Sequence, residues 1–508
     1  MSKNLVTNVL SGTSLYIINI IVAFIISPIM VRVLGNNDYG LWEMVMGIVG
    51  YMGILDLGLG PALLRHVAVS HGQNDKNDLQ ETISTAMALF LGLGFIAVLL
   101  FTIISIYPQT IVSDQSVRVD RLELVLILFA ANAALLFPLK LYVGVLMGLQ
   151  KHHLINSTRS ILIIARATLV FLLFKAFPGK GLLTLAVLEI ASNAIQFALY
   201  AMALRQQKSI PRFSPFRCTK RKMKELFGYG VKSALFMVAS RLQYASMPFI
   251  IGKAIGIGFI VYFVLPNRLV EYAKGLSLAI GFPLTPYFAD MIGKNNEDDL
   301  KKGWLITSFT LQIITLAMPL YLFFCGEAFL RLWIGDSYAT AGRWALYALL
   351  IGLAAEAFAP NARQMLLAKD QHGRIAIVCV LLAICSIPLS YWGAKWSGVA
   401  GAALGSSIIT ITISLITFKL TTSIMGISII NYINKTVTPL IIPLSLLGFT
   451  LWLLNKLITP NNYFMLILQI LLSGIIYSAS IWIFSISKDM REALRSSIMS
   501  KFRKQHIC

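Results

Sequence analysis

Ionisable side chains interrupt stretches of this sequence that are otherwise apolar enough to lie in a membrane. The basic ones are Lys140, Arg166, Lys232, Arg241, Arg268, Lys274 and Arg363, and the acidic ones are Glu43, Asp56, Glu189, Glu271 and Glu356. A charge in hydrocarbon costs about 3 kcal/mol, so such groups usually face a water-filled cavity or an oppositely charged partner. The basic excess favours a cavity for phosphate or pyrophosphate, because Arg offers a planar fork of donors and Lys a point charge.

Helical spacing groups several of these charges. Glu271 and Lys274 are three residues apart and share a helical face, and Arg268 lies beside them. Glu356 and Arg363 are seven apart and also share a face. The same spacing permits internal pairing, of Glu271 with Arg268 or Lys274 and of Glu356 with Arg363. A cationic cavity and structural ion pairs therefore both remain open interpretations.

The other charges differ in how deep they lie. Arg166 falls close to the centre of its apolar segment, whereas Lys140, Lys232 and Arg363 lie near segment ends, where a long side chain can reach the interface. Asp56 follows Leu55 in a glycine-rich stretch that weakens the helix. It either carries a coupling proton or pairs with a basic residue. Coupling or pairing roles are also predicted for the acidic residues Glu189, Glu271 and Glu356.

The elements that carry these charges have the length of membrane spans. The chain is 57% hydrophobic and only 13% charged, and a hydrocarbon core of about 30 Å needs roughly 20 apolar residues per helix. Fourteen spans are predicted, at residues 9–31, 40–62, 82–106, 122–146, 159–176, 181–204, 227–251, 256–282, 303–324, 342–366, 375–392, 399–418, 436–455 and 463–484. We therefore expect an all-α, polytopic membrane protein with about 14 transmembrane helices.

The basic residues alternate between the two sides of these spans. Of the 43 Lys and Arg residues, 26 fall on the side of the N-terminus and 10 on the opposite side. This bias predicts that both termini are cytoplasmic and that the protein is a multi-pass protein of the inner (cytoplasmic) membrane. It also accounts for most of the net charge of +21 without nucleic acid as a partner. The densest basic cluster, residues 205–224, is expected to be a cytoplasmic loop that orients the chain and contacts headgroups, with specific lipid or partner recognition as the alternative.

The chain has the pattern of an internal duplication. Pro28 and the polar loop at residues 71–79 are repeated as Pro248 and the loop at residues 292–300. This predicts two parallel six-helix halves, with the domain limits 1–204, 205–226 (basic cytoplasmic linker loop), 227–418, 419–484 (two extra helices) and 485–508 (basic cytoplasmic tail). Parallel repeats of this kind are typical of transporters.

Catalytic and cofactor motifs are missing from the sequence. The five cysteines and six histidines have no metal-ligand spacing, and no P-loop is present. The predicted loops are too short to form a catalytic domain outside the membrane. We expect no enzyme activity, no metal and no cofactor.

Three segments resemble one family. They are PIMVRVLGNNDYGL at residues 28–41, YMGILDLGLGPALLR at residues 51–65 and GVLMGLQK at residues 144–151. Together they resemble the polysaccharide and O-antigen (Wzx-type) flippases of the multidrug/oligosaccharidyl-lipid/polysaccharide exporter superfamily. With the fourteen predicted spans, the resemblance covers nearly the whole chain.

The resemblance implies a function that the residues alone do not. It implies a flippase that moves an undecaprenyl-pyrophosphate-linked oligosaccharide from the cytoplasmic to the periplasmic leaflet by alternating access, for O-antigen, capsule or exopolysaccharide synthesis. Cavity cations would hold the pyrophosphate, and Arg32 matches the arginine in the first span of lipid II flippases. The implied partners are the lipid-linked substrate, membrane lipids and polysaccharide polymerase machinery. Coupling to H⁺ or Na⁺ stays open, and a cation-coupled small-molecule exporter of the same superfamily is the alternative.

Overall fold

The structure is a computed structural model that describes residues 3–56, 58–108, 119–207, 210–281, 283–294 and 296–486. The regular elements of these residues are all helices, which confirms the predicted all-α class. The chain forms two compact units, one of Met1–Val264 with Ala376–Gly405 and the other of Leu265–Ile375 with Ser406–Cys508. The predicted tail lies outside the described residues from position 487 onward.

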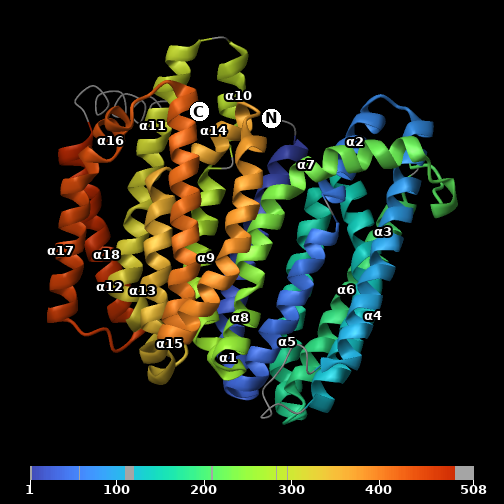
Figure 1. Cartoon of the computed structure of the whole chain (residues 1–508), viewed down its shortest axis with the longest axis horizontal. Helices are drawn as coiled ribbons and strands as arrows, with labels where there is room; N and C mark the ends of the chain where they lie inside the picture. Colours follow the sequence, from blue (N-terminus) through green and yellow to red (C-terminus); the bar gives the residue numbers. More distant parts are fainter. Residues whose placement is uncertain are drawn as a thin grey trace, which may run out of the picture. The chain divides into compact units, whose positions relative to one another are not determined.

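The first unit contains the long helices of the N-terminal part of the chain. Within it α3 packs on α4, α4 packs on α6, and α1 packs on α5; α3, α4 and α6 run side by side in Figure 1. Its elements are α1 (Lys3–Leu55), α2 (Leu59–Gly72), α3 (Lys76–Ile106), α4 (Val119–Gly148), α5 (His152–Ala176), α6 (Gly181–Arg205), η2 (Pro215–Arg217), α7 (Lys220–Ala245), α8 (Met247–Ala254), η3 (Ile257–Phe259) and the start of α9 (Val261–Gly281).

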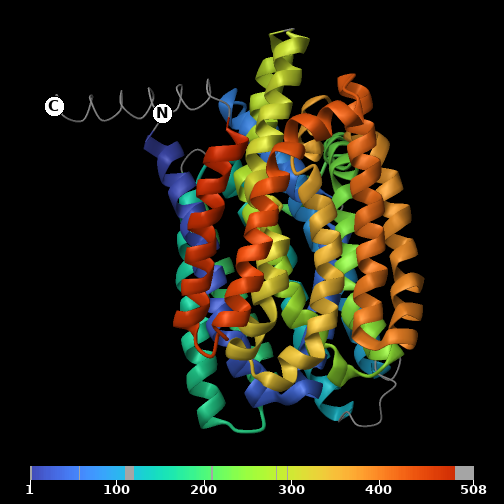
Figure 2. The same ribbon diagram turned by 90° about the vertical axis from the view of Figure 1, so that its left-hand side faces the viewer.

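The second unit contains the rest of α9 and most of the C-terminal helices. Here α12 packs against α17 and α18, which lie side by side in Figures 1 and 2. Its elements are α10 (Leu284–Gly293), α11 (Glu297–Thr315), α12 (Ala317–Trp333), α13 (Asp336–Phe358), α14 (Ala362–Ala368), α15 (His372–Met425, whose middle part belongs to the first unit), α16 (Ile429–Thr436), η4 (Thr438–Leu440), α17 (Ile441–Leu457), α18 (Tyr463–Ser480) and the π-turn η5 (Ile481–Ser485).

The helices are long and apolar enough to cross a membrane many times. In the described part, 10 helical segments meet that standard, and the two longest, Leu10–Leu55 and Ile375–Met425, contain 46 and 51 residues. At 1.5 Å per residue each exceeds a core of about 30 Å twofold, so each can supply two spans. The backbone leaves helical geometry at Gly35 in the first and at Ser397 and Gly398 in the second. Both kinks fall between two predicted spans.

The repeated polar loops also fold alike. Before α3, the Asp75 carboxylate accepts hydrogen bonds from the backbone N–H groups of Asn77 and Asp78, at 3.1 and 2.9 Å. Before α11, the Asn296 side chain accepts from the N–H of Asp299 at 3.1 Å. Each loop therefore ends in a side-chain cap that starts a membrane helix, which is the usual role of Asp and Asn at that position.

A polar network closes the break between α13 and α14. The last carbonyls of a helix have no partner within it, and Pro360 follows as the second residue after α13. The Phe358 carbonyl accepts hydrogen bonds from the Gln312 amide and from the Tyr432 hydroxyl, the latter at 3.3 Å. The fully buried Asn361 accepts from Ser308 at 2.8 Å. At a helix end outside a membrane, water would donate hydrogen bonds to such carbonyl groups. Here Gln312 and Tyr432 donate them instead.

Two glycines bring the halves of α15 into backbone contact. Gly398 has a φ of 62°, and the chain turns there so that Gly393 and Gly401 face each other. A side-chain carbon built on either glycine would overlap the carbonyl group of the other. The turn therefore requires glycine at both contact positions.

A buried ion-pair cluster joins the start of α7 to α3. The Lys222 ammonium, 3% exposed as a residue, lies 2.6 Å from the Asp78 carboxylate and 2.9 Å from that of Glu225. Arg221 adds a bond of 2.9 Å to Glu81 of α3. The basic cluster at 205–224 is thus not a loop throughout, since α7 begins at Lys220 and Lys222 is held inside the protein.

The pKa of the Lys222 ammonium is raised. Burial lowers it, but the hydrogen bonds and charges of Asp78 and Glu225 outweigh burial. Because the pKa is higher in the folded state, the contribution to stability is complete below the usual Lys value of about 10.4 and is lost as the pH rises through the raised value.

We predict that Lys222→Met destabilises the protein while Lys224→Met does not. The first change leaves two carboxylates beside an apolar group, and the loss of one partner of a buried pair costs about 2 kcal/mol here, where Arg221 still lies near Asp78. The second removes an exposed cation from the same helical turn. Thermal unfolding of both variants in detergent measures the difference, and equal melting temperatures would contradict it.

Candidate functional site

The predicted site residues fall into two groups, one in each unit. The first unit carries Arg32, Asp56, Lys140, Arg166, Glu189, Lys232 and Arg241, and the second carries Arg268, Glu271, Lys274, Glu356 and Arg363. The side chain of Lys232 is outside the described part. On α9, Arg268 is half-buried and Glu271 is exposed, and Arg363 is exposed on α14. Among the remaining residues, contacts separate paired charges from exposed ones.

Asp56 and Lys140 form an ion pair at the break between α1 and α2. The Lys140 ammonium lies 3.1 Å from one carboxylate oxygen of Asp56, and the other oxygen accepts a hydrogen bond of 2.9 Å from the Gly58 N–H. Gly58 has a φ of 75°, a conformation in which glycine is favoured. Asp56 therefore joins α4 to the turn that starts α2. Of the two sequence interpretations of Asp56, the structure contains the pairing.

Arg166 and Glu189 form a second pair, between α5 and α6. The guanidinium donates to the carboxylate, and the two side chains are 41% and 22% exposed. The pair lies far from either end of two helices that qualify as membrane spans. A pair at that depth neutralises the arginine, as insertion energetics require.

A third pair holds α9 to α13 in the second unit. The Lys274 ammonium lies 3.2 Å from the Glu356 carboxylate. The helical spacing suggested Glu271 as a partner of Arg268 or Lys274, and Glu356 as a partner of Arg363; the pair of Lys274 with Glu356 is a further contact. The 82 residues between Lys274 and Glu356 explain why local spacing did not reveal this contact.

Arg241 and Arg32 differ from these cations. Both side chains are exposed, and neither forms an ion pair within the part of the chain that the structure describes. On α7, the Arg241 guanidinium lies beside α1 at two glycines: its atoms are 4.0 and 3.8 Å from where a side-chain carbon would stand on Gly50 and Gly53. At both distances a side-chain carbon would be in ordinary van der Waals contact with the guanidinium, which therefore lies close to the backbone of α1.

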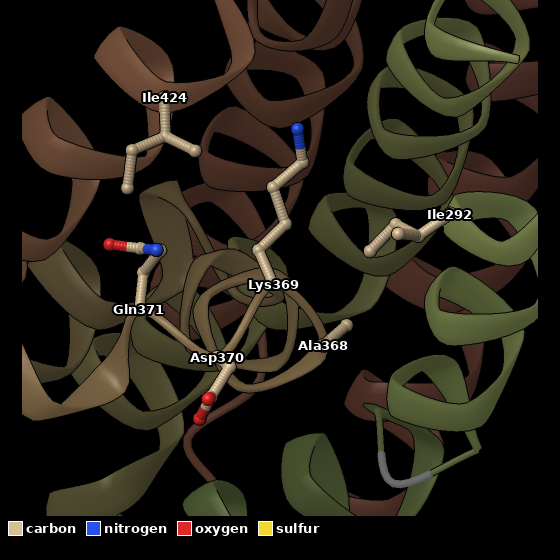
Figure 3. A pocket seen from close by; sticks show the side chains of 6 residues that line it. All are labelled: Ile292, Ala368, Lys369, Asp370, Gln371 and Ile424. Atoms are coloured by element: carbon tan, nitrogen blue, oxygen red, sulfur yellow. The ribbon is translucent and has the colours of Figure 1, made fainter. Parts of the chain in front are cut away.

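A cavity in the second unit lies apart from these charges. It has a volume of about 460 Å³ and is lined by Ile292, Ala368, Lys369, Asp370, Gln371 and Ile424, which Figure 3 shows around the start of α15. The Lys369 ammonium lies 3.4 Å from the Glu297 carboxylate. The cavity contains none of the predicted site residues.

Among the described residues, no group of three or more His, Cys, Asp and Glu side chains is placed so that it could hold a metal ion. Sequence reasoning missed the cluster around Lys222 and the network around Gln312. Lys222 belongs to a run of basic residues that the sequence analysis placed in a loop. Asp78, an acidic residue in the repeated polar loop, could have indicated a partner for it. Gln312 is uncharged and had no marker besides Pro360 in the neighbouring helix.

Known proteins show the same fold and sequence pattern. The family profile of polysaccharide biosynthesis proteins matches residues 5–292. A Shigella flexneri protein that carries the name of an O-antigen transporter is 22% identical over 382 residues, which are 75% of this chain and 88% of that protein.

Solved structures extend the likeness over most of the chain. The lipid II flippase MurJ in an inward closed conformation superimposes with a TM-score of 0.70, at 14% identity, over 94% of this chain and 98% of its own. An inward-facing multidrug resistance transporter of the MATE family, in the MOP superfamily, gives a TM-score of 0.65, at 15% identity, over 81% and 94%. These likenesses concern the fold. The profile match spans more than half of the sequence, and the chain is a multi-pass membrane protein that belongs to the polysaccharide biosynthesis protein family.

Proposed function

We propose that the protein is a flippase for a lipid-linked oligosaccharide. It moves undecaprenyl-pyrophosphate-linked repeat units from the cytoplasmic to the periplasmic leaflet by alternating access, and both of its termini are cytoplasmic. The observation that carries the proposal is Arg241, an exposed guanidinium with no ion pair among the described residues, on a helix of a polysaccharide-biosynthesis family member. A guanidinium in such a place suits a pyrophosphate, whose oxygens accept two parallel hydrogen bonds from it.

The pairing of the other cations sharpens the proposal. Lys140, Arg166 and Lys274 are each neutralised by a carboxylate, so their first role is to hold helices together. The substrate role then concentrates on Arg241, with Arg32 as the second exposed cation that forms no ion pair among the described residues. Asp56, Glu189 and Glu356 each bind a lysine or arginine, whereas Glu271 on α9 is exposed. A cation-coupled drug exporter therefore stays the alternative, with Glu271 as the carboxylate for a cationic drug.

Deletion of the gene in its native host tests the function. The deletion strain should lack surface polysaccharide and accumulate the lipid-linked precursor, and the wild-type gene should restore both. A strain that keeps its surface polysaccharide, with no second flippase present, contradicts the proposal. Drug sensitivity without a polysaccharide defect would indicate the exporter instead.

Arg241→Ala should abolish complementation while the protein stays in the membrane. Loss of a charge-assisted contact costs about 1.5–3 kcal/mol, which corresponds to a roughly 10- to 100-fold loss of transport. Arg241→Lys should retain part of the activity, since a point charge replaces the fork. The matched control is Lys224→Ala, an exposed cation on the same helix. Surface polysaccharide per cell is the measurement, and full activity of Arg241→Ala would remove the cation from the mechanism.

Asp56 and Lys140 should behave as a structural pair in a double-mutant cycle. Asp56→Asn and Lys140→Gln should each lower stability by about 2 kcal/mol, because each leaves one charge without its partner. The double variant should regain at least half of the stability that either single variant loses. An amide oxygen at position 56 can still accept the hydrogen bond from the Gly58 N–H. Melting temperatures in detergent give the coupling. If Asp56→Asn keeps full stability and instead abolishes the pH dependence of transport, Asp56 is a coupling residue.

A further inference from the structure

The linker before α7 presents a second set of charges that the ion-pair cluster does not use. Arg212, Arg217 and Lys220 are exposed and form no ion pair with the described residues, whereas the neighbouring Arg221 and Lys222 are paired with carboxylates. The linker thus separates its cations into two that hold α7 to α3 and three that face outward.

An aromatic side chain lies among the outward-facing cations. Phe216, in the short turn η2, is 96% exposed, so almost nothing in the protein covers its ring. An exposed Phe between Arg and Lys residues is unfavourable in water but is typical of segments that rest in a membrane interface, where the ring enters the acyl boundary and the cations meet phosphates. We call Arg212, Phe216, Arg217 and Lys220 the linker patch.

Hydrogen bonds hold the linker against positions 80–85 of α3. The Gln80 amide donates to the Arg212 carbonyl, and the backbone N–H groups of Ser214 and Thr219 donate to the hydroxyls of Ser84 and Thr85, both at 3.2 Å. In Figure 1 the green linker lies against α3 beside the start of α7. Five residues of α3 span about 7.5 Å, so the linker patch is held within a narrow layer.

The length of α3 places that layer near the expected membrane boundary. Helix α3 has 31 residues and is therefore about 46 Å long, whereas the hydrocarbon core is about 30 Å thick. If the excess is shared between its ends, about five residues at each end lie outside the core. The contacts at positions 80–85 fall where the core begins. A side chain that points outward there meets lipid headgroups.

We propose that the linker patch is a binding surface for anionic phospholipids in the leaflet at which α3 begins. The phosphates bind Arg212, Arg217 and Lys220, and the Phe216 ring inserts beneath them. The surface is separate from the substrate cations, because it lies outside the core and on the linker. Its occupancy stabilises the position of the linker on α3, and with it the start of α7, the helix that carries Arg241.

Site-directed spin labelling of the full chain in nanodiscs tests the position of Phe216. The label is placed by Phe216→Cys in a background in which Cys218, Cys385 and Cys508 are Ser, and Asn461→Cys, in an exposed turn, is the aqueous control. In discs of phosphatidylcholine with phosphatidylglycerol, oxygen should relax the label at position 216 more than a water-soluble nickel chelate does, and the control should show the reverse. The same relaxation by nickel at both positions would overturn the insertion.

Lipid counting tests the charge. The triple variant Arg212→Ala/Arg217→Ala/Lys220→Ala should retain fewer phosphatidylglycerol molecules in native mass spectrometry, with affinity reduced roughly fivefold for each cation removed. Lys294→Ala, which removes an exposed cation that is paired with Asp290, is the matched control and should leave the count unchanged. An unchanged count in the triple variant overturns the proposal, as does an equal loss of phosphatidylcholine. If phosphatidylglycerol does not bind but an acidic protein does, the surface is a protein interface and the proposal is wrong.

Discussion

The structure depends on one constraint: in hydrocarbon, no water is available to bind a charge or a free backbone group. Several departures from a plain apolar helix are therefore compensated by another side chain. The turn after Asp56 is closed by that carboxylate, the carbonyl end of α13 by Gln312 and Tyr432, and Arg166 by Glu189. A few charges differ because they stay accessible and are not compensated in this way. Arg241 is one of them, and the functional proposal rests on it.

Two kinds of cation thus coexist within short distances along the chain. Lys222 is internal and serves stability, while Lys220, two residues earlier, faces outward. Helical geometry separates them, since residues two apart point to different sides of a helix. Counting basic residues predicts the orientation of a membrane protein, but it does not tell which of them are available to a ligand or a lipid.

The sequence was a good guide to the elements and a poor one to the contacts. Span length and composition predicted helices of membrane length, because those depend on local sequence. The kinks at Gly35 and Gly398 fall between predicted spans but are known only from the structure. The repeat predicted that α3 and α11 begin alike. The pairs Asp56–Lys140, Arg166–Glu189 and Lys274–Glu356 could not be derived, since 23 to 84 residues separate the partners and packing alone sets them beside each other. The spacing of Glu271 and Lys274 shows that both lie on one face of α9. It does not show which other helix packs against that face.

The backbone contact between Gly393 and Gly401 has a consequence for genetics. Every substitution there introduces an atom where a carbonyl already stands, so loss of function at these positions carries no information about the transported molecule. In a saturation screen scored by surface glycan, both glycines would rank with the most sensitive positions of the chain. Mutational intolerance would then point to a tight turn of α15 rather than to a ligand contact, and only a parallel screen for protein abundance would separate the two.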